Sequence, residues 1–280
     1  MKISIVTINY NNVDGLKKTL SSVVEQSYRE IEHIIIDGGS TDGSVDAIKE
    51  YVAANPNKDP FFKHTIKWVS EKDSGIYNAM NKGIKKATGA YVQILNSGDI
   101  YAAADVVERM VAEIEKAEYP ELLYGNMIKK DYTTGKIIGK SKVVEYSLRQ
   151  YYSSTMNHDC CYFRRNLFET YGLYDENLKI VSDWKWFLLA IGLGNVKPEY
   201  VDIDVTIFDC SGISETNLEL RNKERRQVLE EALPPAVLAD YDKHAFETSQ
   251  MDRLRKHHLY WFVYFIERVL FKLEKWRVLR

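Results

Sequence analysis

The first 120 residues alternate short apolar runs with segments of helical spacing. Four runs are rich in isoleucine, valine and aromatic residues and are expected to form strands: residues 3–8, 33–36, 66–69 and 91–95. The segments between these runs, and residues 102–117 after them, place apolar side chains three and four positions apart, which is typical of helices. Strands that are apolar throughout and alternate with helices indicate an α/β fold, with a mostly parallel central sheet flanked by helices.

Polar residues follow each of the four predicted strands. Three of these loops contain aspartate, and the four are residues 7–9, 37–42, 70–75 and 96–99. Ligands of open α/β sheets bind beyond the carboxyl ends of the strands, where these loops meet. Each loop alone is equally well explained as an ordinary turn, because Asp, Gly and Ser are common turn and cap residues. Four such loops at one edge of a sheet favour a nucleotide site.

Missing motifs and the charge balance exclude several classes of protein. No G-x-G-x-x-G sequence follows the first predicted strand, and no G-x-x-x-x-G-K-[ST] sequence occurs, which disfavours nicotinamide dehydrogenases and P-loop enzymes. With 38 basic and 40 acidic residues, the net charge of −2 gives no sign of a nucleic-acid partner. The three cysteines make neither a disulfide framework nor a zinc site, and no stretch approaches the ~20 apolar residues of a membrane span. These signs predict a cytoplasmic protein.

The pattern becomes mixed after residue 120. Residues 122–130 and 136–142 flank the turn-like sequence Asp-Tyr-Thr-Thr-Gly, and they predict a hairpin. Further along the chain we expect helices at residues 166–171, 181–191 and 215–233, and a strand at residues 200–208.

The last thirty residues differ from the rest in charge. Residues 251–280 carry eight Lys or Arg and three Asp or Glu. Their apolar residues recur at helical spacing: Leu259, Phe262, Ile266, Val269, Leu273 and Trp276. An amphipathic helix with basic and interfacial aromatic residues is suited to lie on the anionic inner face of a membrane. A helix that packs on the catalytic domain, or that pairs in a homodimer, explains the pattern almost equally well.

Four segments together give the chain a family resemblance. They are Val-Thr-Ile-Asn-Tyr-Asn at 6–11, Ile-Asp-Gly-Gly-Ser-Thr-Asp-Gly at 36–43, residues 70–83, and Leu-Asn-Ser-Gly-Asp at 95–99. The chain resembles a family 2 glycosyltransferase with a nucleotide-diphospho-sugar transferase (glycosyltransferase A-type) fold. The nearest subgroup resembles bacterial transferases that assemble exopolysaccharide or O-antigen units.

The resemblance implies a division of the chain into domains. Residues 1–214 would form the catalytic domain, with 1–119 as the nucleotide-sugar-binding half and 120–214 as the acceptor half. Residues 215–280 would form a C-terminal helical extension that ends in the basic amphipathic tail.

The resemblance also implies donor-binding residues. Thr7 and Asn9 would line the nucleobase pocket, Asp37 would meet the base or ribose, and Asp73 would lie over the base. Ser40 follows Asp37 in the same loop, and Asn96 and Ser97 begin the sequence that stands in place of the family's D-x-D element.

Two departures from the family pattern affect the expected metal and phosphate contacts. Asn96 and Gly98 replace carboxylates, which leaves Asp99 as the expected metal ligand. Mg²⁺ or Mn²⁺ often uses one or two carboxylates plus substrate phosphates, so Asp99, two diphosphate oxygens and waters would hold the cation. The alternative is a plain Asn-Ser-Gly-Asp turn, but the metal site is favoured because the turn directly follows a buried strand, where such ligands belong. Met80 stands where many members have an arginine, so a phosphate contact is missing or is supplied elsewhere.

Two residues are candidates for acid–base catalysis. Asp183 stands near the start of a predicted helix and matches the family's base element, and His158 stands where family members often have a histidine on the acceptor side. Asp183 could instead only cap its helix, although Ser182 could do that as well, and His158 could be structural.

The resulting hypothesis is an inverting hexosyltransferase. It would move a sugar from a nucleotide-diphospho-sugar, with UDP as the expected nucleotide, to a hydroxyl of a lipid-linked or growing glycan in surface polysaccharide synthesis. It would be cytoplasmic and peripheral on the inner membrane face. The alternative is a catalytically silent nucleotide-sugar-binding scaffold. A nucleotidyltransferase is disfavoured, because the loop after the first strand lacks a G-G-x-G-T-R-L-type sequence.

Overall fold

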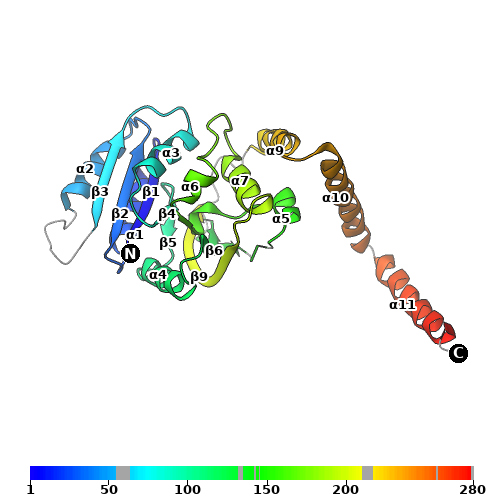
Figure 1. Ribbon diagram of the computed structural model, residues 1–280. Coiled ribbons are helices and arrows are strands. Elements are labelled where there is room, and N and C mark those ends of the chain that lie inside the picture. The colour runs from blue at the N-terminus through cyan, green and yellow to red at the C-terminus, as the bar shows by residue number, and fades with distance from the viewer. Residues whose placement is uncertain are drawn as a thin grey trace. The chain divides into compact units, whose positions relative to one another are not determined.

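The structure is a computed structural model, and it describes residues 1–54, 64–131, 135–141, 143–144, 146–209, 217–256 and 258–278. The chain forms two compact units, Met1–Val228 and Leu229–Arg280. The first unit contains the sheet and its covering helices, and the second contains helices (Figure 1).

The predicted strands of the first 120 residues form a parallel half-sheet (Figure 1). Their observed bounds are β1 Ile3–Asn9, β2 Ile31–Asp37, β3 Thr65–Ser70 and β4 Tyr91–Ile94. β1 pairs with β2 and β4, and β2 pairs with β3, all in parallel. β1 and β2 are buried along their whole length because helices cover both faces, as their near-continuous apolar sequences predict.

Helices α1 (Val13–Val24), α2 (Ser44–Ala54) and α3 (Ile76–Lys86) cover this half-sheet. On one face, Leu16 and Leu20 of α1 and Ile48 of α2 form a buried cluster with Ile35 of β2. On the other face, α3 packs against β1 so closely that a Cβ atom at Gly83 would lie 2.2 Å from a methyl carbon of Val6. The helices therefore fix the carboxyl ends of the strands from both sides.

The second half of the sheet is mixed. Its strands are β5 Ile100–Tyr101, β6 Leu122–Lys130, β7 Ile137–Lys140, β8 Cys161–Arg164 and β9 Pro198–Asp209. Within the described residues the sheet has nine strands in the order β3-β2-β1-β4-β8-β6-β9-β5, with β7 paired to β6. β8 runs antiparallel to both β4 and β6, whereas β6 and β9 are parallel. The α/β fold and the hairpin of β6 and β7 are confirmed, and the parallel arrangement is confined mainly to the first half.

Short helices complete the first unit: α4 Val106–Lys116, α5 Leu148–Ser153, a 3-10 turn at His158–Cys160, α6 Leu167–Thr170 and α7 Ser182–Phe187. The helix expected at 181–191 is α7 followed by a π-helical turn over Leu188–Gly192. Phe163 of β8 packs against Phe168 of α6 and against Trp186 and Phe187 of α7, with ring centroids 5.3–5.8 Å apart. This aromatic cluster anchors α7 to the sheet.

The C-terminal region contains more helix than the sequence predicted, because residues 235–250 are helical as well. α9 covers Leu218–Ala232, α10 covers Pro235–Arg255 and α11 covers His258–Val278. The helix expected to begin near Met251 corresponds to the end of α10 together with α11. α10 begins earlier because Pro235 occupies the first position of a helix, where proline is favourable. None of the described helices has the length and hydropathy needed to cross a bilayer.

Candidate active site

A cavity of about 880 Å³ lies beside the loops that follow β1, β2, β3 and β4. Seven of the ten residues proposed from the sequence line it: Asn9, Asp73, Asn96, Ser97, Asp99, His158 and Asp183. Its size suits a ligand larger than a single sugar. The convergence predicted for the polar loops is therefore present in the structure.

Thr7, Asp37 and Ser40 do not line this cavity. Thr7 is fully buried, and its Oγ1 lies 3.0 Å from Nε2 of His33 on β2. In a strand successive side chains point to opposite faces, so Thr7 faces the interior next to a residue of the neighbouring strand. Its expected contact with a nucleobase therefore stays a prediction.

Asp37 organises the loops instead of facing the cavity. Its carboxylate accepts hydrogen bonds from Asn9 Nδ2 at 2.8 Å, from Ser40 Oγ at 2.6 Å and from Ser70 Oγ at 2.6 Å. Burial opposes ionisation of Asp37, but the hydrogen bonds from Ser40, Ser70 and Asn9 hold its pKa below the usual value. This ionised carboxylate ties the loops after β1, β2 and β3 together, so Asn9 reaches the cavity in a fixed position.

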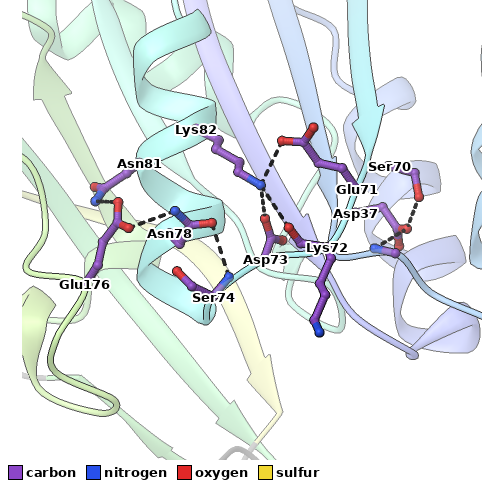
Figure 2. A network of polar contacts seen from close by, with 11 residues as sticks. Asp37, Ser70, Glu71, Lys72, Asp73, Ser74, Asn78, Asn81, Lys82 and Glu176 are labelled. Carbon is purple, nitrogen blue, oxygen red and sulfur yellow. Dashed lines mark hydrogen bonds and ion pairs between the residues drawn. The ribbon is translucent and has the colours of Figure 1, made fainter.

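Asp73 reaches the cavity from the loop after β3 and is held by Lys82 of α3 (Figure 2). Lys82 Nζ makes ion pairs with Asp73 and, at 2.8 Å, with Glu71. Burial lowers the pKa of Lys82, but its bonds to Asp73 and Glu71 outweigh burial and raise it overall. Lys82 is therefore ion-paired within the loop. It does not take the place of the arginine that many family members have where this chain has Met80. The sequence analysis did not predict this lysine, because its partners become neighbours only in the fold.

α3 is also tied to the segment at residues 174–176, which precedes α7. Asn78 Nδ2 and Asn81 Nδ2 donate to Glu176 at 2.8 and 2.9 Å (Figure 2). Asn81 also exchanges hydrogen bonds with the backbone of Tyr174. The loop before α7 is thereby fixed against the helix that carries Lys82.

The loop at 96–99 is a rigid turn held by α1. Thr19 Oγ1 donates to the carbonyl oxygen of Asp99 at 2.7 Å and accepts from the amide of Gly98 at 3.0 Å. Gly98 has a φ of 108°, a conformation that other residues rarely adopt, which explains a glycine at this position. The Asp99 residue is 4% exposed and lines the cavity. Thr19 is a further residue that the sequence analysis did not identify.

His158 and Asp183 form a pair at the opposite wall. His158 Nδ1 lies 3.1 Å from Asp183 Oδ2, and both side chains are less than one-fifth exposed, at 17% and 18%. Tyr77 donates its hydroxyl hydrogen to Asp183 Oδ1 at 2.8 Å. His158 Nε2 lies 3.1 Å from Asn96 Nδ2. Asn96, His158, Asp183 and Tyr77, which all line the cavity, are therefore linked in one series of hydrogen bonds.

The environment keeps Asp183 ionised. Burial would raise its pKa, but the bonds from His158 and Tyr77 and the charge of His158 lower it below the usual value. Burial would lower the pKa of His158, but the bond to Asp183 and the charges of Asp183, Asp159 and Asp99 raise it. An ionised, partly accessible carboxylate of this kind can accept a proton from a substrate hydroxyl group.

The neighbours of Asp183 are anchored to the interior. Trp184 Nε1 donates to the carbonyl oxygen of Tyr151 at 2.6 Å, and Trp186 Nε1 donates to that of Gly172 at 3.0 Å. α7 has Val181 at its N-cap, with no capping bond from a side chain. Ser182 Oγ instead accepts a hydrogen bond from the amide of Asp175. Helix capping alone therefore does not explain Asp183.

Comparison with known proteins identifies the family. Residues 4–172, more than half of the chain, match the family described as Glycosyl transferase family 2. The chain belongs to glycosyl transferase family 2. A relative from Mycobacterium tuberculosis, described as an uncharacterized glycosyltransferase, is 31% identical over 217 residues, which cover 75% of this chain and 76% of the relative. A PGL/p-HBAD biosynthesis glycosyltransferase of Mycobacterium bovis is 26% identical over 76% of this chain and 79% of its own length.

Solved structures share the fold at low sequence identity. The chain resembles residues 1–349 of S. aureus TarS, solved with UDP-GlcNAc, with a TM-score of 0.64 and 18% identity, over 82% of this chain and 64% of the TarS chain. It also resembles the mannosyltransferase PcManGT of Pyrobaculum calidifontis, solved with GDP-Man and Mn²⁺, with a TM-score of 0.60 and 17% identity, over 88% of this chain and 69% of that chain. The glycosyltransferase A-type fold is confirmed, and the family makes the protein a glycosyltransferase.

The loop at 96–99 fits a divalent cation only together with a bound donor. Among the described residues no group of three or more His, Cys, Asp and Glu side chains is placed to hold a metal. Asp99 offers one carboxylate at the cavity wall, and Asn96 Oδ1 is a buried oxygen with no hydrogen-bond partner in the described part of the chain. A hard cation that uses one carboxylate completes its shell with substrate phosphates and water. The residues present are consistent with that arrangement.

Proposed function

We propose that the cavity binds a nucleoside-diphospho-sugar and that the protein transfers the sugar, with inversion, to a hydroxyl group of an acceptor. The observation that carries this proposal is the series of contacts from Asn96 through His158 to Asp183, which links the loop after β4 to the first turn of α7 along the lining of the cavity. An inverting transferase must hold the donor and the acceptor at the same time, because the acceptor oxygen attacks the sugar carbon while the diphosphate leaves from the other side.

Asp183, Tyr77 and His158 each have a role in the proposed reaction. Asp183 takes the proton of the acceptor hydroxyl group as the new bond to the anomeric carbon forms. Tyr77 and His158 hold the two carboxylate oxygens of Asp183, so the base is fixed in position before the acceptor arrives. The bond from the anomeric carbon to the diphosphate breaks as the new bond forms, and the negative charge passes to the departing nucleoside diphosphate.

The donor side is assigned to the loops after β1, β3 and β4. Asn9 and Asp73 would bind the nucleobase and ribose, and Asn96 and Ser97 the sugar diphosphate. Asp99 would hold Mn²⁺ or Mg²⁺, which would neutralise charge on the leaving diphosphate. Asp37 and Ser40 would act indirectly, by fixing Asn9. Thr7 would act only if the loops rearranged around a donor.

UDP is the proposed nucleotide, and a lipid-linked or growing glycan is the proposed acceptor. One fold neighbour is solved with UDP-GlcNAc, and curated relatives are named for PGL/p-HBAD biosynthesis. A role in surface polysaccharide synthesis is consistent with both. The catalytically silent scaffold is the less economical alternative, because a scaffold has no need of an ionised carboxylate held from both sides.

The second unit is proposed to contact the inner membrane face. On α11, consecutive residues 261–266 have exposed apolar or aromatic side chains, and Phe265 is 66% exposed. Exposed apolar side chains also follow at Val269, Leu270, Phe271 and Leu273, so they are not confined to the predicted seam. Basic residues lie on either side of the 261–266 stretch, including Arg253 and Arg255 before it and Arg268 and Lys272 after it. The competing explanation is that this helix pairs with another copy in a homodimer. The proposal of a peripheral, cytoplasmic location depends on the membrane contact.

Thermal unfolding with a panel of nucleotide-sugars tests the proposed function. A correct donor at 100 times its Kd stabilises the folded state by about 2.7 kcal/mol, which raises the unfolding temperature by a few degrees. We expect one donor class to stabilise the protein, more strongly with Mn²⁺ than with EDTA, and to release nucleoside diphosphate on incubation. Stabilisation without any release, over all acceptors tried, would favour the silent scaffold. Absence of stabilisation by every donor would contradict the proposal.

A further inference from the structure

Glu224 of α9 holds that helix against the wall of the cavity. Its carboxylate accepts hydrogen bonds from the backbone amides of Lys179 at 2.7 Å and Ile180 at 2.9 Å, and the residue is only 6% exposed. Lys179 and Ile180 both line the cavity, as does Asp183 just beyond them. All these residues belong to the first compact unit. The middle of α9 is therefore fixed beside the acceptor wall.

Arg225, the next residue of α9, lies over a tryptophan of α7, the helix that carries Asp183. Its guanidinium carbon is 4.9 Å from the centre of the Trp184 ring, and Trp184 immediately follows Asp183. A guanidinium that stacks on a ring keeps its in-plane N–H groups available for oxygen atoms. Arg225 Nε is buried and has no hydrogen-bond partner among the described residues. Burial and the nearby charge of Arg221 lower the pKa of Arg225, whereas the charge of Asp183 raises it.

Lys179 is the second cation at this wall. Its side chain is exposed and lines the cavity, and no carboxylate in the described ranges pairs with it. Arg225 is half-buried, and no carboxylate in the described ranges pairs with it either, whereas Lys82 pairs with Asp73 and Lys185 pairs with Asp175. Asp183 is the nearby carboxylate, and its two oxygens are already bonded to Tyr77 and His158. Within the described ranges, therefore, neither of these two positive charges forms an ion pair with a carboxylate.

We propose that Lys179 and Arg225 bind a phosphate group carried by the acceptor. The inference rests on the proposed function, in which the donor diphosphate occupies the loop at 96–99 and the acceptor hydroxyl group meets Asp183. A phosphate offers several oxygen atoms and up to two negative charges, so it can accept from the guanidinium edge and from the ammonium group together. The acceptor is accordingly a phosphate-bearing molecule and not a neutral glycan.

Two sources of that phosphate share this chemistry. In a lipid-linked acceptor the phosphate joins the sugar to the lipid, and in a soluble acceptor it is a sugar phosphate. Farnesyl phosphate and glucose 6-phosphate serve as probes of the two sources, and farnesol and methyl glucoside are their uncharged counterparts.

The test is a calorimetric titration of each probe into the full chain, with and without saturating UDP and Mn²⁺. The variants are Arg225→Gln and Lys179→Met, and the matched control is Lys223→Met, an exposed lysine on the same helix. We expect a phosphate probe to bind and its uncharged counterpart not to bind. Each variant should weaken binding about ten-fold, the usual loss for one charge-assisted hydrogen bond, and the control should not. Lys179 is exposed, so Lys179→Met keeps the test valid even if Arg225→Gln perturbs the fold.

The outcomes separate this inference from the proposed function. Binding that UDP displaces would place the phosphate in the donor site and overturn the inference. Equal binding to wild type and to both variants, or no preference for phosphate over the uncharged probe, would overturn it as well. The titration needs no turnover, so a protein that transfers no sugar but binds the phosphate through Lys179 and Arg225 would contradict only the proposed function.

Discussion

His158 Nδ1 lies 3.1 Å from Asp183 Oδ2, and this contact joins two elements that the sequence separates by 25 residues. His158 opens the turn before β8, and Asp183 lies in the first turn of α7. Because His158 also contacts Asn96, a change at the donor loop can reach the proposed base through one imidazole ring. The sequence analysis treated the two residues as rival candidates for the base. The structure makes them hydrogen-bonded partners, and in the proposed function the histidine orients the base.

Tyr77→Phe tests whether the base must be held in position. Losing the bond to Asp183 Oδ1 should lower kcat about ten-fold and leave the KM for the donor unchanged. It should also move the acidic limb of the pH–rate profile to higher pH, because removing a hydrogen-bond donor raises the pKa of the carboxyl group.

Tyr174→Phe provides the matched control for this prediction. The two tyrosine rings lie 5.7 Å apart, and the Tyr174 hydroxyl has no hydrogen-bond partner within the described chain. Its removal should change neither kcat nor the pH profile. Equal effects of the two variants would argue against a positioning role for Tyr77.

Asp99→Asn tests the proposed metal site. The amide keeps the size of the side chain but removes its charge, so we expect loss of Mn²⁺- or Mg²⁺-dependent turnover with an unchanged unfolding temperature. Asp105→Asn, at an exposed aspartate a few residues further on, is the control and should behave like the wild type. If turnover in EDTA equals turnover in Mn²⁺, the metal has no role in the reaction.

Glu32→Gln tests a structural carboxylate at the far end of the half-sheet. Glu32 is 1% exposed and accepts from Ser4, Lys67 and Thr88. Burial opposes ionisation, but these bonds lower its pKa from 4.5 to about 2. A lowered folded-state pKa contributes stability that is present above about pH 4.5 and is lost as pH falls through about 2. We expect the variant to lose roughly 1–3 kcal/mol of unfolding free energy at pH 7.

Urea unfolding at a series of pH values measures this loss. The difference between wild type and variant should shrink as the pH falls from about 4.5 to about 2. Glu113→Gln, at a surface pair with Lys116, should change stability by less than about 0.5 kcal/mol. A pH-independent difference for Glu32→Gln would indicate a packing defect instead of a lost charge.

Deletion of residues 257–280 tests the membrane proposal. The cut removes α11 and leaves α10, which ends at Arg255. We expect binding to anionic vesicles to be lost, and in the full chain to fall steeply with salt, since each basic residue near the surface contributes about 1 kcal/mol. Sedimentation with vesicles of anionic and of neutral lipid measures this. Salt-insensitive binding, or a change from dimer to monomer on deletion, would favour a helix that pairs with another copy.

The sequence predicted the four polar loops that meet at the cavity because the information for them is local. Each buried strand is an apolar run, each loop after it is polar, and Asn96 through Asp99 follows β4 directly. Asp183 was also predictable, since a carboxylate in the first turn of a helix is visible in the sequence. Thr7 could not be placed, because β1 is buried on both faces and its sequence does not show which residues reach the cavity.

Residues that act through distant partners could not be predicted. Lys82, Tyr77 and Glu224 hold the site by bonds to Asp73, Asp183 and the amides at 179 and 180, and only the fold makes these groups neighbours. The extent of α10 was missed for a different reason. Its apolar residues follow no clear helical period, so the pattern gave no signal between Pro235 and Met251.

The kinetics of Asp183→Asn test the central claim most directly. Nucleoside diphosphate release should be measured for wild type, Asp183→Asn and His158→Ala with the donor and acceptor that support turnover. Loss of a general base predicts a kcat lower by roughly 10²–10⁴-fold for Asp183→Asn, with little change in donor affinity. Near-normal transfer by Asp183→Asn, together with loss of transfer in His158→Ala, would contradict the account and make His158 the base.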